Sequence, residues 1–329
     1  MTTSPNTSGS NPGLRQYSHT KSAYGGEGWT PRPRAIAQEA GHEWGHFGMT
    51  SEWKPLKRVV LHKPGAELAA SADDFNAVNM LAPLNLAKAQ AQHDGMAQAY
   101  RDAGVAVHYL DPREQPRPNQ MFMADLMFMT PEGAILARPA SAVRAGEERV
   151  AAERLAAMGV PIIRSVGGRG TFEGADAMWL DDKTVLLGRG LRTNDEGAAQ
   201  VTDALRWMGV DVIQIDLPFG TMHMMGMIRI VDKDLAIAWP MRLVHRGVEA
   251  LKSRGYRVAY IPDENEVRDG LAMNMVTLGP RKILMCGGNP ITQEFYEELG
   301  VNCVAVPTDE LSKAAGAIGC LTGIVEREK

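Results

Sequence analysis

The chain has 329 residues, with 35 Lys and Arg against 39 Asp and Glu and a net charge of −4. This charge excludes the basic footprint of a nucleic-acid-binding protein and the polybasic patch of a membrane-surface protein. No apolar run approaches the roughly 18–20 residues that span a bilayer, and the polar start MTTSPNTSGSNPG has no apolar signal core, so we expect a cytoplasmic protein.

Residues 1–50 stand apart from the rest of the chain. They are rich in Gly, Pro, Ser and Thr and show no sustained hydrophobic period, which predicts an extended, partly irregular N-terminal arm. The arm contains His42-Glu-Trp-Gly-His46, which fits the H-E-x-x-H pattern of zinc hydrolases. That chemistry needs both histidines on a stable helix, and the nearby glycines weaken any helix here. The sequence therefore disfavours zinc hydrolysis and predicts no bound metal or cofactor.

From Ser51 onward one pattern recurs, in which a short strand, an amphipathic helix, a Gly and a β-branched strand follow one another. The Gly suits a helix C-cap in the left-handed region. Length alone would suggest two domains. Five similar units, however, most simply pack around a common axis, so we predict that residues 51–329 form one closed α/β domain with five blades. The five glycines are Gly104, Gly159, Gly209, Gly255 and Gly300.

The loops between successive units occupy equivalent places in the repeat. They should therefore converge at one end of the axis, where binding and catalytic residues gather. These loops are also rich in Met, which would give a polar site apolar walls. The candidate residues that they carry are Asp125, Glu173, Asp176, His223 and Cys320.

Three cysteines are an odd number with no disulfide or metal-ligand pattern. A free cysteine is most often a buried structural thiol, and Cys286 and Cys303, inside apolar strands, fit that interpretation. Cys320 follows the small-residue stretch GAIG, which lets a substrate approach and leaves N–H groups free to stabilise a thiolate. A lone His is usually structural, but His223 lies one loop away from this thiol and could share a proton with it.

The acidic candidates have two interpretations. Glu173 and Asp176 lie in FEGAD and Asp125 lies in FMAD, where acids commonly cap turns and helices. Alternatively, their carboxylates accept paired hydrogen bonds from a planar guanidinium, which would make Asp125 and Asp176 substrate-binding residues. Arg192, just past a strand end, is either solvated or a bidentate clamp on a substrate carboxylate. The residues alone leave these alternatives open.

The motifs taken in chain order resemble those of the guanidino-group-modifying superfamily, which comprises amidinotransferases, arginine deiminases and dimethylarginine dimethylaminohydrolases. The resemblance runs from about Ser51 to Glu328 and rests on SEWKPLKRVVLHKPG, FMAD, FEGAD, GLRTN, the loop around His223 and GAIGCLT. It implies a pentein fold, which is a five-bladed ββαβ propeller with pseudo-fivefold symmetry.

The resemblance also implies roles for the candidate residues. Cys320 would be the nucleophile and His223 the general acid and base. Glu173 and Asp125 would hold the guanidinium, and Arg192 would contact the substrate α-carboxylate. The sequence thus predicts a cysteine-dependent hydrolase that cleaves a C–N bond of a small cationic guanidino or amidino substrate through a covalent thiouronium-type intermediate.

Two positions depart from the family pattern. Deiminases and amidinotransferases usually have an acid two residues after the His, where this chain has Met225. Dimethylarginine hydrolases also lack that acid, which points to a substrate with a substituted nitrogen. Gly319 precedes the nucleophile where many members have His.

The hydrolase is favoured over two alternatives because Arg192 offers a carboxylate anchor and Met-lined walls suit alkyl groups on the substrate. The first alternative is an amidinotransferase. The second is a non-enzymatic five-bladed binding module like that of a ribosome anti-association factor, which would not need Cys, His and Glu in converging loops. A homodimer or a larger homo-oligomer is compatible with each.

Overall fold

The computed structural model describes residues 18–329, so residues 1–17 of the predicted arm lie outside the described part of the chain. Within it the strands form five three-stranded sheets. The middle strand of each sheet pairs antiparallel with one neighbour and parallel with the other. The strands, sheet by sheet in pairing order, are β15 (Gly323–Arg327), β1 (Leu56–Leu61) and β2 (Ala106–Tyr109); β3 (Met127–Thr130), β4 (Gly133–Leu136) and β5 (Ile162–Ser165); β6 (Ala177–Asp181), β7 (Thr184–Arg189) and β8 (Asp211–Asp216); β9 (Ile228–Asp232), β10 (Leu235–Ala238) and β11 (Arg257–Tyr260); β12 (Val276–Gly279), β13 (Lys282–Cys286) and β14 (Asn302–Val306).

A helix joins the two parallel strands of every sheet, because parallel neighbours need a long crossover connection. These five crossover helices are α4 (Leu86–Asp102), α6 (Glu147–Ala157), α7 (Asp195–Trp207), α8 (His245–Lys252) and α10 (Pro290–Glu298). The shorter helices are α2 (Ile36–Glu39), α3 (Ala70–Asp74), α5 (Met123–Leu126), α9 (Glu264–Arg268) and α11 (Ile318–Leu321), and the 3-10 turns are η1 (Ser18–Thr20), η2 (Ser22–Tyr24), η3 (Ala66–Ala69), η4 (Ala142–Arg144), η5 (Gly174–Asp176), η6 (Met224–Gly226) and η7 (Leu311–Ala314).

The five predicted strand–helix–strand units are all present, and the Gly after each crossover helix has the predicted left-handed backbone. The φ angles at these glycines run from 71° to 81°. A side chain at such a position is strained, whereas glycine is not. The glycines therefore end each helix and turn the chain into the parallel strand.

Substitutions of two glycines in the first unit should have opposite effects on stability. Gly104 has φ 79°, so Gly104→Ala should lower the free energy of unfolding by about 1 kcal/mol. Gly95 lies inside α4 with open space around its Cα, so Gly95→Ala should raise the free energy of unfolding by roughly 0.5–1 kcal/mol. Urea unfolding of both variants measures the two effects. If both variants changed the free energy of unfolding in the same direction, this account of the helix end would be wrong.

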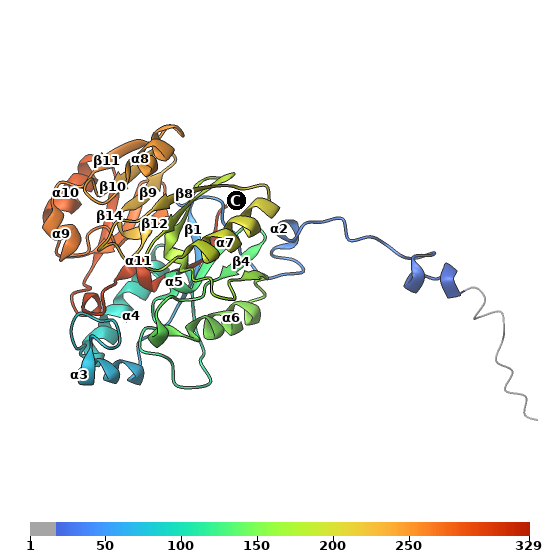
Figure 1. Ribbon diagram of the computed structural model, residues 1–329, viewed down its shortest axis with the longest axis horizontal. Helices are drawn as coiled ribbons and strands as arrows, with labels where there is room; N and C mark the ends of the chain where they lie inside the picture. Colours follow the sequence, from blue (N-terminus) through green and yellow to red (C-terminus); the bar gives the residue numbers. More distant parts are fainter. Residues whose placement is uncertain (1–17) are drawn as a thin grey trace, which may run out of the picture.

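Each sheet also contains an inner strand that pairs antiparallel with the first strand of the predicted unit. All four residues of both β3 and β12 are buried, whereas β5 and β11 are largely exposed edge strands. Clusters of buried apolar side chains connect neighbouring sheets, from the sheet of β1 through those of β3 and β6, then from β6 to β9, from β9 to β13 and from β12 back to β1. The short helices that precede the inner strands are consequently brought together, and α5 lies beside α11 (Figure 1). In addition, α5 contacts η5, and η5 contacts η6.

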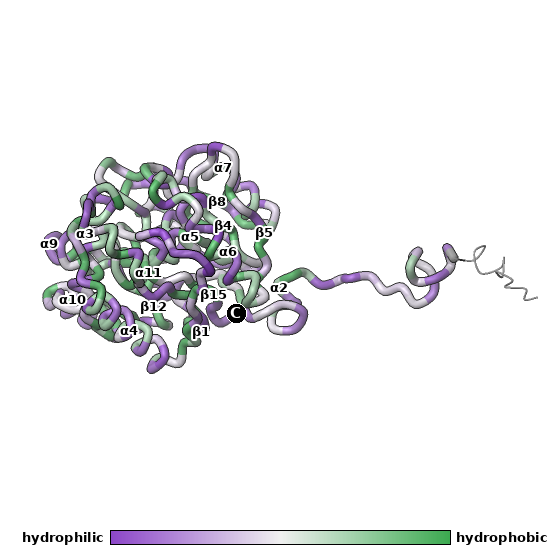
Figure 2. The backbone as a smooth tube through the Cα atoms, turned by 90° about the horizontal axis from the view of Figure 1, so that it is seen from below, coloured by the Kyte–Doolittle hydropathy of each residue, from purple (hydrophilic) through white to green (hydrophobic). Residues whose placement is uncertain are grey.

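The described part of the arm divides into two stretches. Residues 18–34 extend away from the body and carry mostly hydrophilic side chains (Figures 1 and 2). Further on, Gly45 N–H donates to Gly159 C=O at 2.9 Å, and Phe47 is fully buried in the body. His42 and His46 are exposed and lie in turns after α2 has ended, so they do not share a helix. Every helix among residues 18–329 is too short or too polar to cross a membrane.

Candidate active site

Each of four predicted site residues lies immediately before, or within, the short helix that leads into the inner strand of a sheet. Asp125 is in α5, Glu173 precedes η5, His223 precedes η6 and Cys320 is in α11. Because these short helices contact one another, the predicted convergence of loops from distant parts of the chain is present. The fifth loop contributes a residue that sequence reasoning missed, Asn274, two positions before β12.

Asn274 holds both the backbone and the thiol of Cys320. Its Nδ2 donates to Cys320 Sγ at 3.0 Å, and its Oδ1 accepts from Cys320 N–H at 3.1 Å. Burial and the charge of Asp125 raise the pKa of the Cys320 thiol, while the Asn274 hydrogen bond and the Arg229 guanidinium act in the opposite direction. The place of Asn274 in the loop PDENEVRDGLAMN, equivalent to the other four, was the signal that could have identified it.

His223 is buried and paired with Glu173, and its Nε2 lies 2.6 Å from Glu173 Oε2 and 3.8 Å from Asp125 Oδ1. Burial favours the neutral ring, but Asp125 and the Glu173 hydrogen bond outweigh it and raise the pKa of His223 to about 9. Burial would likewise raise the pKa of Glu173, yet His223, Arg144 and Arg192 hold it well below its ordinary range. The pair is therefore an imidazolium–carboxylate pair at neutral pH.

Arg144 is a second residue that the sequence did not reveal, although a buried acid needs a cationic partner. It ends η4 and is 3% exposed. Its Nη1 lies 2.7 Å from Asp125 Oδ2 and 3.3 Å from Glu173 Oε2, and its Nη2 lies 2.8 Å from Glu147 Oε2. Arg192 Nη1 lies 3.2 Å from Glu173 Oε1. The guanidinium groups of the protein itself thus balance the negative charges of Asp125 and Glu173.

One carboxylate oxygen of a residue that borders the smaller cavity beside Cys320 is still available. Asp125 Oδ1 is buried and has no hydrogen-bond partner among residues 18–329. Asp176, by contrast, is used within the protein, since its oxygens accept from Thr193 Oγ1 at 2.7 Å and from Met224 N–H at 3.0 Å. Burial raises the pKa of Asp176 to about 6. Asp176 therefore fixes the backbone next to His223, whereas Asp125 presents an open carboxylate oxygen.

Two cavities meet at Cys320. The smaller, of about 20 Å³, is bordered by Asp125, Arg144, Arg192, His223 and Cys320. The larger, of about 350 Å³, is in the size range of small-molecule sites. Residues that border both cavities are Met222, His223, Ala315 and Cys320. The thiol and the imidazole can therefore reach the same bound molecule.

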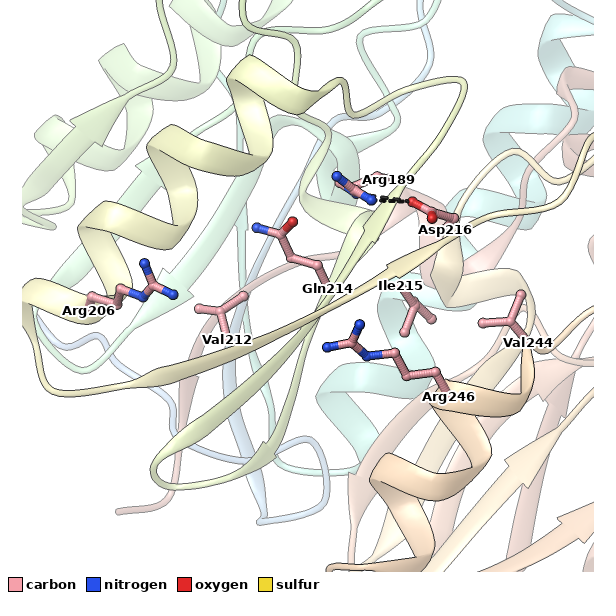
Figure 3. Close-up of a pocket in the computed structure, with 8 residues that line it drawn as sticks. All are labelled: Arg189, Arg206, Val212, Gln214, Ile215, Asp216, Val244 and Arg246. Carbon is pink, nitrogen blue, oxygen red and sulfur yellow. Dashed lines mark hydrogen bonds and ion pairs between the residues drawn. The ribbon is translucent and has the colours of Figure 1, made fainter.

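A still larger cavity, of about 510 Å³, runs along β8 between α7 and α8 (Figure 3). Arg189, Arg206 and Arg246 border it, and Arg189 forms an ion pair with Asp216 at 2.7 Å. Its lining has no thiol and no imidazole. Size alone therefore does not identify the reactive site.

The donor atoms of Asp125, Glu173 and His223 lie within 4.8 Å of one another, a spacing that could hold a metal ion. The charges around them disfavour this use. Arg144 contacts both carboxylates, and His223 is an imidazolium at neutral pH. A divalent cation would be repelled by these groups, so the three side chains suit proton transfer and guanidinium binding better.

Comparison with known proteins gives a consistent picture. The model of the family described as N,N dimethylarginine dimethylhydrolase, eukaryotic, matches residues 66–324. The chain is 25% identical over 267 residues to the N(G),N(G)-dimethylarginine dimethylaminohydrolase of Pseudomonas aeruginosa, which covers 81% of this chain and 98% of that protein. It is 26% identical over 231 residues to the enzyme of the same name from Streptomyces coelicolor, covering 70% of this chain and 83% of that one.

Solved structures share the α/β fold. One is a mutant of the Pseudomonas aeruginosa enzyme complexed with citrulline, with a TM-score of 0.69 and 22% identity over 83% of this chain and 100% of that one. Another is SxtG, an amidinotransferase from Microseira wollei in the saxitoxin biosynthetic pathway, with a TM-score of 0.70 and 14% identity over 86% of this chain and 98% of that one. The same fold thus carries both a hydrolase and a transferase.

Proposed function

Because the chain belongs to the N,N-dimethylarginine dimethylhydrolase family, which makes it a hydrolase of C–N bonds in linear amidines, we propose a mechanism for this reaction. In it, Cys320 attacks the guanidino carbon of the substrate. The observation that carries this proposal is that Cys320 and His223 border the same two cavities. We further propose that the five sheets are the blades of a pentein propeller and that residues 51–329 form this single domain. The apolar clusters, which connect the sheets in cyclic order, support that arrangement.

Substrate binding uses the charges at the smaller cavity. A guanidinium N–H of the substrate donates to Asp125 Oδ1, the acceptor without a partner among the described residues. Arg192 reaches Glu173 through Nη1, and its other N–H groups can bind a substrate carboxylate. The bound cation also stabilises a thiolate, and so opposes the effect of burial on Cys320.

Cys320 loses its thiol proton to solvent as the substrate cation binds, and the first chemical step forms a bond between the thiolate Sγ and the guanidino carbon. The C–N bond to the departing amine then breaks, and that amine takes a proton. Because Nε2–H of the imidazolium points to Glu173 at 2.6 Å, the proton comes from Nδ1 of His223. The product of this step is a thiouronium on Cys320 and a neutral imidazole.

The second step returns the enzyme to its starting state. Neutral His223 accepts a proton from a water molecule, whose oxygen attacks the thiouronium carbon. The C–S bond then breaks and releases the Cys320 thiolate, while the urea-type product gives its extra proton to solvent or to the departed amine. In the alternative transferase reaction an acceptor amine takes the place of this water, as the amidinotransferase with the same fold illustrates.

Intact-protein mass spectrometry during turnover tests both the nucleophile and the reaction. The protein is incubated with arginine, its N-methylated derivatives and simple guanidines, without any added amine. We expect a covalent adduct on Cys320 with the mass of the retained amidine fragment, together with a urea-type product. No adduct and no product with the whole panel would overturn the proposed function. An adduct that is discharged only when an amine is added would establish the transferase.

Removing the Asn274 side chain should slow the reaction of the thiol. In Asn274→Ala the thiolate loses a charge-assisted donor, so its pKa rises and its alkylation by iodoacetamide at neutral pH should slow roughly 10- to 100-fold. The matched control is Asn289→Ala, because Asn289 is buried and donates to Gly270 C=O and Cys286 C=O without contacting the thiol. Equal alkylation rates in wild type and Asn274→Ala would show that Asn274 does not stabilise the thiolate.

A further inference from the structure

We propose that the larger cavity beside Cys320 is a subsite for an amine that carries a carboxylate, namely the amine that departs from the guanidino carbon. This inference rests on the proposed function, because it concerns the leaving group of the same reaction. It assigns the substrate class as guanidines whose departing nitrogen bears a short carboxyalkyl group. Three features of the cavity carry the argument, namely a buried cation, a second cation at a ring, and apolar walls without acids.

The buried cation is Arg229, which is 8% exposed and borders the larger cavity. Its Nε donates to Met273 C=O at 2.8 Å, and its Nη2 is buried without a hydrogen-bond partner among residues 18–329. Burial lowers the pKa of the Arg229 guanidinium, although the group keeps its charge at neutral pH. A buried guanidinium with an unused donor is costly unless an anion completes it.

The position of Arg229 is fixed next to the nucleophile. A side chain at residue 319 would collide with the guanidinium of Arg229, so Gly319 leaves the space that this guanidinium fills. Residue 319 directly precedes Cys320. The departure of Gly319 from the family pattern therefore has a physical counterpart, which is a cation held against the backbone of the nucleophile.

The second cation is Arg242, whose guanidinium lies 5.1 Å from the centre of the Trp239 ring. Both residues border the larger cavity, and no ion pair with Arg242 is found in the described part of the chain. A third arginine, Arg268, is already paired with Asp269 at 2.8 Å. The lining of this cavity includes no Asp or Glu. The charges of Cys320 and Glu52 act on Arg229 from a distance, but neither Arg229 nor Arg242 forms a direct ion pair with a carboxylate among residues 18–329. Two such guanidinium groups favour a carboxylate ligand, which they can bind through parallel N–H groups.

The walls determine what connects this carboxylate to the reacting nitrogen. The side chains of Met225, Met227 and Met273 line the cavity, and such apolar walls suit a short aliphatic chain. His223 and Cys320 border the same cavity. An amine bound there would therefore have its nitrogen at the proton donor and its carboxylate towards the arginines. When the S–C bond forms and the C–N bond breaks, the proton of His223 passes to this nitrogen and the amino acid departs.

A pair of substrates tests the subsite. One is arginine with a carboxyethyl group on the terminal guanidino nitrogen, and the other is its carbamoylethyl analogue, in which an uncharged amide replaces the carboxylate. In the wild type, kcat/KM should be roughly 10- to 100-fold higher for the acid, the range expected for charge-assisted hydrogen bonds. In Arg229→Gln this ratio should fall towards one. The ratio cancels any general loss of activity in the variant.

Two further variants make the test specific. Arg242 lies nearer the surface than Arg229. Arg242→Gln should therefore lower the same ratio of kcat/KM values even if Arg229→Gln folds poorly. Arg268→Gln is the matched control because its partner is Asp269, and it should keep the wild-type ratio. A wild-type ratio near one, or a ratio that survives both Arg229→Gln and Arg242→Gln, overturns the subsite. The subsite is also overturned if Arg229→Gln lowers kcat/KM equally for both substrates and slows the alkylation of Cys320. That result would mean that Arg229 acts on the thiol. Adduct formation on Cys320 with either substrate would leave the proposed function standing.

Discussion

Cys320→Ser should abolish turnover and the covalent adduct together. Serine keeps the backbone N–H that donates to Asn274 Oδ1 and an acceptor for Asn274 Nδ2. Its hydroxyl has no accessible ionised form near neutral pH, so the nucleophile is lost while the site keeps its shape. We expect kcat to fall by at least about 10⁴-fold, the scale seen when a nucleophile is removed from a catalytic unit. Steady-state assays and intact mass after substrate incubation measure the two losses.

The control for this variant is Cys303→Ser. Cys303 lies on the edge strand β14, and burial raises the pKa of its thiol to about 12, so it is inert at neutral pH. This variant should keep both turnover and the adduct on Cys320. Turnover that persists in Cys320→Ser, or an adduct that moves to Cys303 or Cys286, would eliminate Cys320 as the nucleophile.

The repeat made much of the fold predictable. Each strand–helix–strand unit is coded locally, by an apolar period of 3.6 residues, a C-cap Gly and a β-branched run. The inner strands β3, β6, β9, β12 and β15 were not identified from the residues. They are short, and both faces are buried in β3 and β12, so they lack the alternation that marks a half-exposed strand.

The candidate site was predictable only where a residue type itself indicates chemistry. Cys320 and His223 stood out as a thiol and an imidazole in equivalent loops, and the acids followed from the same equivalence. The residue types of Asn274 and Arg229 carry no such signal, since amides are common in any loop and Arg229 lies on strand β9. Their contacts join distant parts of the chain, 46 residues apart for Asn274 and Cys320 and 44 residues apart for Arg229 and Met273. Such pairings arise from packing, which a single sequence does not display.

Arg144 shows the same limit from the side of charge. A buried Glu173 predicted a cationic partner, and the substrate was the expected one. The structure supplies Arg144 and Arg192 as well, so the acids do not depend on the substrate for their charge balance. In the proposed mechanism the substrate guanidinium therefore binds at Asp125 Oδ1 without displacing them, and Glu173 orients and charges His223.

That role of Glu173 gives the second large expected effect. In Glu173→Gln the imidazole keeps a hydrogen-bond partner but loses its nearest negative charge, and Arg192 loses its ion-pair partner, whereas Arg144 still pairs with Asp125 and Glu147. The proton on His223 is then held less tightly, and kcat should fall roughly 10²- to 10⁴-fold, the range for general acid–base catalysis. NMR titration of the imidazole should give a pKa near 9 for His223 in the wild type and a lower pKa in the variant.

The sign of the linked stability effect follows from the same pKa. In the folded wild type the pKa of His223 is raised from 6.5 to about 9, so His223 contributes stability that is fully present below about pH 6.5 and is lost as the pH rises through about 9. Glu173→Gln should therefore destabilise the protein most below pH 6.5 and least above pH 9, which urea unfolding across this range measures. Glu147→Gln is the matched control, because Glu147 is equally buried and pairs with Arg144 rather than with His223. It should leave the pKa of His223 near 9. An unchanged pKa in Glu173→Gln would show that Asp125 and Asp176 hold the proton without Glu173.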